Sequence, residues 1–584
     1  MRTMREKSIE EIPVANGAEA FLEQIRADGN VRFLFANTGT DHGPIIEALA
    51  KSEGVEGPGP RTILVPHELS AVSMAHGYYN VSHHPQVVLV HTLPGTANAL
   101  GGVINACSSN VPVVLVAGRT PITEGEVVGG RSRHIHWRQE SRDQGAILRE
   151  FVKWDYENRS NKNLPTVVSR AFKIAMTEPR GPVYLTLPRE WLCESMETTR
   201  VLRDAFKPPA KNQANTAALE EAADLLLGAR EPLIVTKYLG RNPEAVGHLV
   251  ELAELLSMPV VQHFLYMNFP TDHPLYLGHE TLRVAKRSDV IFFIDVDVPW
   301  DNPSRDILRP EVKVIQLEVD PSFSSIPVWG FRVDHAMAGC SETSLPVLNA
   351  ILRRKLNGNA DLKRQYEERR KRIQGEHASM KKDRDARIEA LKNDKPIHPL
   401  WVSKCIGEVM DEKTLLVGET VTSLLPEVIE LDRAGSFFGS PPAGHLGWGL
   451  GAAIGAKLAA PDHTVIAATG DGAYIFGAPT ASHFTAQKYG VPFLTVIYNN
   501  QAWNASINSV LEFYPSGVAV EKRTFPGCDL TPSPRFELTA EACGAYAERV
   551  EEPGQLKEAL KRALKVVREE KRQALLNVIC KSPL

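Results

Sequence analysis

The sequence predicts a three-domain α/β protein built on parallel β-sheets. Its 584 residues exceed what one hydrophobic core usually supports, so three domains of roughly 150–200 residues are expected. Short β-branched runs alternate with helical patterns in three successive stretches, which is typical of parallel sheets covered by helices. We therefore expect three α/β units in series.

The first unit is expected over residues 12–195, where five short apolar runs are typical of buried strands. These runs are VRFLFANTG, TILVP, QVVLVHT, VPVVLVAG and GPVYLTLP. A second unit is expected over residues 214–350, with strands in PLIVTK, MPVVQH, DVIFFIDVD and VKVIQLEVD. A third is expected over residues 395–578, with strands in TLLVGE, HTVIAATGDG, PFLTVIYNN and ALLNVIC. Each unit has enough candidate strands for a sheet of its own.

Residues 354–394 differ from these units because Lys, Arg, Asp and Glu are intermixed along them. Mixed charge of this kind indicates a solvated linker helix rather than a basic binding patch.

Composition argues against several classes of protein. With 43% hydrophobic residues, 23% charged residues and a net charge of −4, nothing indicates a nucleic-acid or membrane partner. The longest apolar runs fall short of the ~20 residues that a membrane span needs, and the start MRTMREKSIEEIP lacks the apolar stretch of a secretory signal. Seven scattered cysteines without metal-binding spacing complete the expectation of a cytoplasmic protein with reduced thiols.

The most informative motif is Gly470-Asp471-Gly472, which follows an apolar run and precedes a helical pattern. Backbone N–H groups at such a strand end bind phosphate, and a carboxylate there suits Mg²⁺. The next apolar run ends at Asn500, and neighbouring parallel strands end at the same edge of a sheet. The Asn500 side-chain oxygen and the Ala502 carbonyl are therefore expected to complete a magnesium site with Asp471. A lone GDG also forms ordinary turns, but GDG followed by a helix and a strand ending in Asn-Asn is more specific.

This segment resembles the diphosphate-binding motif of thiamine diphosphate-dependent enzymes of the acetolactate synthase and benzoylformate decarboxylase type. The resemblance covers nearly the whole chain and implies the thiamine diphosphate-binding fold, with pyrimidine, central and diphosphate domains. It implies thiamine diphosphate and Mg²⁺ as cofactors, with Gly470, Asp471, Gly472, Ala473 and Asn500 around the diphosphate. Ala473 stands where relatives often have serine, so one hydrogen bond of ~1 kcal/mol to phosphate is expected to be missing.

Two upstream segments, GETVT and AGHLGWG, resemble the family loops that contact the diphosphate and the aminopyrimidine. The resemblance implies cofactor contacts from Thr420 and Thr422, and a Gly444 carbonyl that accepts from the 4′-amino group. It also implies that Leu446 is the bulky wedge under the V-shaped cofactor. The alternative for Leu446 is simple core packing.

In the first unit, the run VPHE places Glu68 at a strand end. The resemblance implies that Glu68 hydrogen-bonds N1′ of the aminopyrimidine and promotes the imino tautomer, whose nitrogen removes the C2 proton of the thiazolium. A buried glutamate is rare unless it is paired, which favours this catalytic role over a surface position.

Two more residues of this unit match benzoylformate decarboxylase. His91 resembles its first active-site histidine, and Thr40 in the loop NTGTDH stands at the place of its substrate-binding serine. A histidine in an apolar run is more often structural, but a neighbouring Gly-rich loop favours function for His91. The stretch RSRHIHWRQE at residues 131–140 is either an anion-binding segment or a solvated basic loop.

The resemblance implies a thiamine diphosphate- and Mg²⁺-dependent C–C bond lyase or ligase acting on 2-oxo acids. One expectation is acetolactate synthase-like carboligation through a decarboxylated enamine, and the alternative is non-ligating, benzoylformate decarboxylase-like release of an aldehyde. Two other classes are a catalytically silent, cofactor-binding regulatory homologue and a nucleotide-binding oxidoreductase. Glu68, Asp471 and Asn500 argue against the first, and the missing GxGxxG fingerprint argues against the second.

FAD is not expected, because the central unit has TKYLG and DVDVPW where FAD-containing acetolactate synthases carry glycine-rich and flavin-contacting segments. Glu68 and Asp471 lie in different units, so the cofactor has to bridge an interface. The resemblance implies a homodimer or homotetramer with active sites between chains.

Overall fold

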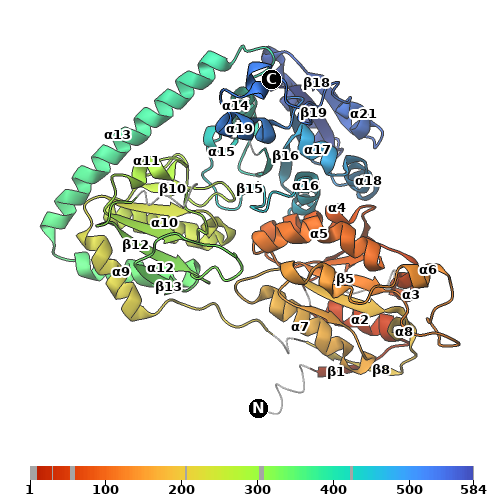
Figure 1. Ribbon diagram of the computed structural model, residues 1–584. Coiled ribbons are helices and arrows are strands. Elements are labelled where there is room, and N and C mark those ends of the chain that lie inside the picture. Colours follow the sequence, from red (N-terminus) through yellow and green to blue (C-terminus); the bar gives the residue numbers. More distant parts are fainter. Residues whose placement is uncertain are drawn as a thin grey trace.

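The computed structural model describes residues 9–28, 30–52, 59–203, 207–300, 308–420 and 425–582. Across these residues the chain forms three parallel sheets, one in each of three regions of the molecule (Figure 1). The first and third regions face each other directly, and the central one lies to their side. The predicted fold class, α/β with three parallel sheets, is confirmed.

The N-terminal sheet has six parallel strands in the spatial order β3-β2-β4-β5-β7-β6. The strands are β2 (Phe33–Asn37), β3 (Arg61–Leu64), β4 (Val87–Val90), β5 (Val114–Arg119), β6 (Asp155–Glu157) and β7 (Val183–Pro188). The helices are α2 (Gly17–Ala27), η1 (Thr40–His42), α3 (Gly43–Ser52), α4 (Glu68–Ser82), α5 (Thr92–Ser108), α6 (Ile135–Arg138), α7 (Leu164–Met176) and α8 (Arg189–Cys193). A separate antiparallel ribbon joins β1 (Ile9–Pro13) to β8 (Thr198–Leu202). Because β3, β2, β4 and β5 are parallel neighbours, the loops after them meet at one edge.

The central sheet has five parallel strands in the order β10-β9-β11-β12-β13. They are β9 (Pro232–Thr236), β10 (Val260–Gln262), β11 (Val290–Ile294), β12 (Lys313–Glu318) and β13 (His335–Ala338). The helices are α9 (Thr216–Gly228), α10 (Pro243–Leu256), α11 (Thr281–Ala285) and α12 (Ser341–Leu356).

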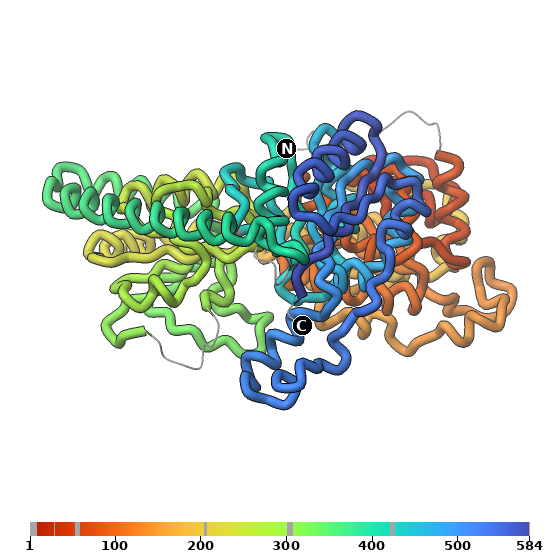
Figure 2. The backbone as a smooth tube through the Cα atoms, turned by 90° about the horizontal axis from the view of Figure 1, so that it is seen from above, coloured from red at the N-terminus to blue at the C-terminus, as the bar shows by residue number. Residues whose placement is uncertain are grey.

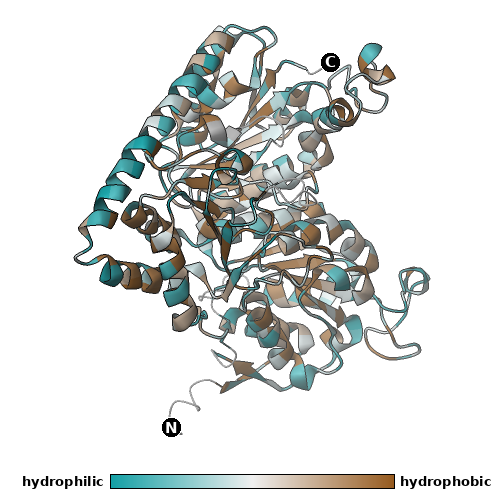
Figure 3. Ribbon diagram, turned by 60° about the vertical axis from the view of Figure 1, so that its left-hand side comes forward, coloured by the Kyte–Doolittle hydropathy of each residue, from teal (hydrophilic) through white to brown (hydrophobic). Residues whose placement is uncertain are grey.

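The helix α13 (Ala360–Leu391) connects this central part to the third sheet. Figure 2 shows it running along the side of the central part toward the C-terminal one. Its surface is mostly hydrophilic, in contrast to the apolar strands (Figure 3), as its mixed charges require. In the part of the chain that the structure describes, no helix is both long and apolar enough to cross a membrane.

The third sheet has six parallel strands in the order β15-β14-β16-β17-β19-β18. They are β14 (Thr414–Glu419), β15 (Phe437–Gly439), β16 (Thr464–Gly470), β17 (Leu494–Asn499), β18 (Tyr546–Val550) and β19 (Ala574–Ile579). The helices are α14 (Pro399–Val409), α15 (Leu425–Val428), α16 (Trp448–Ala459), α17 (Asp471–Phe476), α18 (Pro479–Tyr489), α19 (Asn504–Phe513), α20 (Val518–Glu521), α21 (Phe536–Glu541) and α22 (Leu556–Arg568). Since β14, β16 and β17 are parallel neighbours, their carboxyl ends lie side by side.

The first and third regions are joined where α4 packs against α16 (Figure 1). Glycines allow the two helix backbones to touch: a Cβ atom added to Gly455 would lie 1.9 Å from the carbonyl oxygen of Met74. A Cβ atom added to Gly77 would lie 2.0 Å from the carbonyl oxygen of Ala452. Neither position has room for a side chain. The backbones of α4 and α16 are therefore in direct contact, which fixes the position of one helix relative to the other.

Replacing Gly455 with alanine is expected to lower the free energy of unfolding by about 1–3 kcal/mol, because the new methyl group overlaps the Met74 carbonyl. The matched control is Gly375→Ala in α13, where an added Cβ meets no atom within 4 Å. There alanine should stabilise the helix by up to about 1 kcal/mol. Thermal unfolding followed by circular dichroism measures both variants. A melting midpoint for Gly455→Ala at or above that of the parent would contradict the tight contact.

Candidate active site

Asp471 begins α17 directly after β16, and its carboxylate is surrounded by backbone N–H groups. Oδ1 accepts from the Gly472 N–H at 2.9 Å, and Oδ2 accepts from the Gln501 N–H at 2.7 Å. The neighbouring Asn500 accepts from the Ala502 N–H at 3.0 Å through Oδ1. Burial raises the pKa of Asp471 to about 6, while the N–H groups oppose this rise. Parallel pairing of β16 and β17 thus brings the three predicted metal ligands into one cluster.

The space beside this cluster fits a diphosphate with a divalent cation. A Cβ atom added to Gly470 or to Gly444 would meet no atom within 4 Å, so both backbones border open space. Gly444 also has a φ of 70°, which favours glycine. Among the described residues no group of three or more His, Cys, Asp and Glu side chains is placed to hold a metal. A cation here would therefore be held by one carboxylate, amide and carbonyl oxygens, and phosphate, a ligand set that Mg²⁺ prefers.

The other predicted residues of the cofactor side surround the same edge. Thr420 is half-buried immediately after β14, Leu446 is half-buried in the loop before α16, and Ala473 is buried in α17. Thr422 lies outside the residues that the structure describes.

Glu419, the last residue of β14, is a buried carboxyl group that the sequence analysis missed. It accepts from the N–H groups of Trp448 at 3.0 Å and Gly449 at 2.9 Å, in the first turn of α16. Burial raises the pKa of Glu419 to about 7, against the effect of these N–H groups. Its contacts fix the start of α16 and, with it, the loop that contains Gly444 and Leu446.

Glu68 begins α4, and only 8% of its surface is exposed. Its Oε1 accepts from Asn37 Nδ2 at 2.9 Å, and its Oε2 accepts from Asn98 Nδ2. Asn37 ends β2 and Asn98 lies in α5. Neither asparagine was assigned a role from the sequence. The two amides orient the carboxylate without adding a compensating charge.

His91 directly follows β4 and is bound through both ring nitrogens. Its Nδ1 contacts Asp41 Oδ1, and its Nε2 lies 3.1 Å from Gln139 Nε2. The hydrogen bond with Asp41 raises the pKa of His91, whereas burial opposes the rise. Thr40 is exposed next to Asp41, at the start of η1. The ends of β2, β3 and β4 therefore carry Thr40, Glu68 and His91 to the same edge of the sheet.

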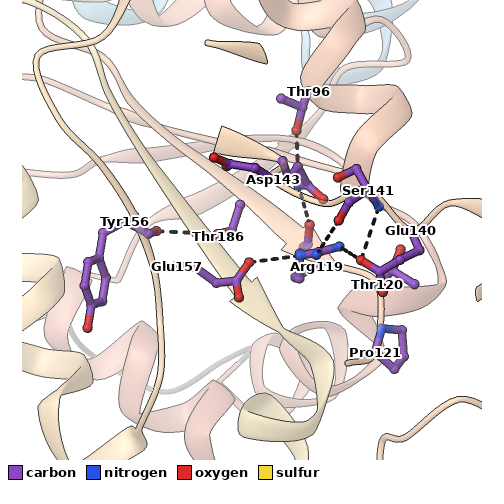
Figure 4. A network of polar contacts seen from close by, with 12 residues as sticks. Thr96, Arg119, Thr120, Pro121, Glu140, Ser141, Asp143, Tyr156, Glu157 and Thr186 are labelled. Atoms are coloured by element: carbon purple, nitrogen blue, oxygen red, sulfur yellow. Dashed lines mark hydrogen bonds and ion pairs between the residues drawn. The ribbon is translucent and has the colours of Figure 1, made fainter. Parts of the chain in front are cut away.

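Arg119, at the end of β5, anchors the loop that carries Gln139 (Figure 4). Its guanidinium donates to Glu157 Oε2 at 2.9 Å and to the Ser141 carbonyl at 2.9 Å, and it also pairs with Glu140. Of its two acidic partners, Glu140 is the last residue of the basic stretch 131–140 and Glu157 follows that stretch. Arg119 is therefore neutralised within the protein rather than left for a ligand.

A cavity of about 370 Å³ lies where the first and third regions meet. His67 and Asn98 line one side of it, and His445 and Phe476 line the other. Asn105 of α5 fixes the far side by donating to the His445 carbonyl at 2.8 Å. The immediate neighbours of Glu68 and Gly444 thus border one space.

The chain matches the N-terminal TPP binding domain of thiamine pyrophosphate enzymes over residues 15–147, their central domain over residues 219–341 and their C-terminal TPP binding domain over residues 420–578. A structure from Mycobacterium smegmatis, described as a proposed thiamin diphosphate-dependent enzyme, has a TM-score of 0.74 and 21% identity. That similarity covers 97% of this chain and 99% of the other and shows a shared fold.

Three named relatives are similar along nearly their whole length. A sulfoacetaldehyde acetyltransferase of Alcaligenes xylosoxydans xylosoxydans is 26% identical, with 99% of this chain and 95% of the relative covered. The acetolactate synthase isozyme 3 large subunit of Escherichia coli is 25% identical, with 95% and 93% covered. A benzoylformate decarboxylase of Pseudomonas aeruginosa is 27% identical, with 91% and 93% covered. Since all three domains of the family are matched in order, the chain belongs to the thiamine pyrophosphate enzymes.

Proposed function

We propose that this protein is a thiamine diphosphate- and Mg²⁺-dependent carboligase that acts on 2-oxo acids in the manner of acetolactate synthase. The observation that carries the proposal is the pair of buried carboxyl groups, Glu68 and Asp471, each at the carboxyl edge of its own parallel sheet. When bound, thiamine diphosphate supplies the electron sink that C–C bond cleavage beside a carbonyl requires. A regulatory homologue without activity would not need Glu68 to be held by two amides.

On the phosphate side, Asp471, Asn500 and the Ala502 carbonyl would hold Mg²⁺. The backbones of Gly470 and Gly472 would lie close to the phosphates. The carboxylate, the amide and the carbonyl are hard oxygen ligands suited to a cation shared with phosphate. Thr420, Thr422 and Ala473 would complete the phosphate environment.

On the pyrimidine side, Glu68 would hold a proton at N1′, while the Gly444 carbonyl would accept from the 4′-amino group and Leu446 would support the bent cofactor. His91 and Thr40 would contact the substrate. The position of all three N-terminal residues at one sheet edge supports this division of roles.

The second candidate is release of an aldehyde, as in a 2-oxo acid decarboxylase. The pairing of His91 with Asp41 favours it, because the hydrogen bond with Asp41 raises the pKa of His91 and so favours the protonated ring that can donate a proton. Ligation is supported by the full-length similarity to an acetyltransferase and to an acetolactate synthase.

We also propose a homodimer or homotetramer in which a second chain covers the edge that the first and third regions of one chain share, so that the active sites lie between chains. Two large apolar side chains of α17, the helix that begins at Asp471, are exposed, namely Ile475 at 41% and Phe476 at 49%. Grouped exposed apolar residues indicate an interaction surface more strongly than scattered ones do.

The central sheet argues against bound FAD. Asp295 and Glu318 are buried at the carboxyl ends of β11 and β12, and the Arg241 guanidinium lies 3.8 Å and 3.5 Å from them. Asp297 pairs with Lys237 at 2.7 Å at the same edge. Dinucleotide phosphates bind at this edge in open α/β sheets, and here Arg241 and Lys237 are already paired with carboxyl groups of the protein rather than left for phosphate.

Asp471→Ala is expected to weaken Mg²⁺-dependent binding of thiamine diphosphate by at least ~100-fold, because the cation loses its only carboxylate among the proposed ligands. Isothermal titration calorimetry measures the change. Asp462→Ala is the matched control, since this aspartate is exposed in the same region. Equal affinity in the Asp471 variant and the control would refute the metal assignment.

Purified protein is expected to show no flavin absorbance in the visible range after gel filtration. The physical reason is that Arg241 and Lys237, the cations at the carboxyl edge of the central sheet, are paired within the protein. A flavin spectrum that stays with the protein would overturn this prediction, and acid extraction with mass spectrometry would identify the cofactor.

Glu68→Gln tests the proposed function directly. The amide fills the same volume but cannot act as an acid at N1′, so turnover is expected to fall by ~10²–10⁴-fold with thiamine diphosphate still bound. The readout is hydrogen–deuterium exchange at C2 of the bound thiazolium, measured by NMR after quenching.

The control is Glu190→Gln, because Glu190 is another buried carboxyl of the same domain and binds Thr123. It should leave the exchange rate unchanged. Exchange in Glu68→Gln as fast as in the parent would show that Glu68 is not the activating group.

A further inference from the structure

Asp41 is a buried carboxylate, 3% exposed, that contacts two histidines. Its Oδ1 pairs with His91 Nδ1, and its Oδ2 lies 3.2 Å from His42 Nε2. The His91 side chain retains 23% exposure. The carboxylate is therefore buried behind a histidine that stays partly exposed.

Two glycines make the space for this pair. A Cβ atom added to Gly39 would lie 2.1 Å from His91 Nδ1, and one added to Gly118 would lie 1.2 Å from Asp41 Oδ2. Any side chain at either position would displace the ring or the carboxylate. The loop after β2 and the end of β5 are thus shaped around the Asp41–His91 contact.

The contact determines which ring nitrogen carries a proton. An ionised carboxylate only accepts, so Asp41 fixes a hydrogen on His91 Nδ1. The other nitrogen, Nε2, lies 3.1 Å from the Gln139 amide. A glutamine amide can donate to a bare Nε2 or, after turning over, accept from a protonated one. Nε2 can therefore gain and lose a proton without losing its hydrogen bond.

The surrounding charges favour the protonated ring. The titratable groups that act on His91 are Asp41, Glu68 and His42, and both carboxylates favour the cation. Burial lowers the pKa of His42, so this neighbour tends to stay neutral. Of the two histidines, His91 is accordingly the one whose cation these groups favour.

We propose that Asp41 is a positioning residue that orients the His91 ring and holds a proton on Nδ1, which leaves Nε2, beside Gln139, as the nitrogen that donates the proton of the reaction. The proposal rests on the proposed function. Conversion of a 2-oxo acid anion to an aldehyde and CO₂ consumes one proton, and so does its ligation to a second 2-oxo acid with loss of CO₂. In either case the proton leaves Nε2, the ring remains neutral with its Nδ1–H bound to Asp41, and a solvent proton restores the cation.

The first test needs no cofactor or turnover. NMR titration of the full chain labelled with ¹³C-histidine follows His91, whose signal is the one missing from His91→Ala. We expect His91 in the parent to titrate above the ordinary value of about 6.5, and Asp41→Asn to lower this pKa. Each unit of decrease lowers the protonated fraction about tenfold on the alkaline side. The charge control is Asp143→Asn, an exposed partner of Arg149, which should leave the titration unchanged.

Titration of His91 in the parent at or below the ordinary value would overturn the proposal, even if Asp41→Asn failed to fold. An unshifted titration in a folded Asp41→Asn variant would overturn it as well.

The second test is the pH profile of turnover. A proton donor is active below its pKa, so activity should fall as the pH rises through the pKa of His91. Asp41→Asn should move this alkaline limb to lower pH and lower kcat about tenfold, with thiamine diphosphate affinity unchanged. In the His91→Ala background, Asp41→Asn should cause no further loss, because the two residues act as one unit. An additive loss would indicate a merely structural role for Asp41 and contradict the proposal.

The two tests separate this proposal from the proposed function. If no 2-oxo acid is turned over, the proposed function fails while the NMR titration still decides whether Asp41 controls His91.

Discussion

The backbone contact between α4 and α16 is the constraint on which the whole site depends. The first helix starts at Glu68, and the second starts after the loop that contains Gly444. Gly77 and Gly455 let the two backbones meet without side chains between them. A contact made of backbone atoms cannot be readjusted by a change of rotamer. The pyrimidine side and the phosphate side are consequently held in one relative position by helix packing.

Glu68 is held differently from the other two buried carboxyl groups of the proposed cofactor edge, Asp471 and Glu419. Asparagine amides bind Glu68, whereas backbone N–H groups bind Asp471 and Glu419. In the latter two, loss of hydration outweighs the N–H groups, and the pKa values rise to about 6 and about 7. A cation beside Asp471 would supply the missing compensation. The Glu419 carboxyl group lies at the N-terminal, positive end of the α16 dipole, and it helps to position that helix.

Strands with continuous apolar runs could be predicted from the sequence, because the interior strands of parallel sheets are buried on both faces. QVVLVHT and DVIFFIDVD became β4 and β11, which are fully buried. β6 and β13 were missed, since they lie at sheet edges and stay partly exposed. In the candidate site, Glu68 and Asp471 stand in recognisable motifs. Asp41 could not be assigned from the sequence, because its partner His91 is 50 positions away and only the pairing of β2 with β4 brings them together.

The space around the Asp41 carboxylate has a consequence for the comparison of family members. A side chain at position 118 would occupy the place of Asp41 Oδ2, only 1.2 Å from the added atom. A larger residue at 118 would therefore displace the Asp41 carboxylate, so the contact of Asp41 with His91 depends on glycine at 118. In an alignment of the family, positions 41 and 118 can therefore be compared as a pair. A family member with a larger residue at 118 would have to hold its histidine at position 91 by a contact other than this one.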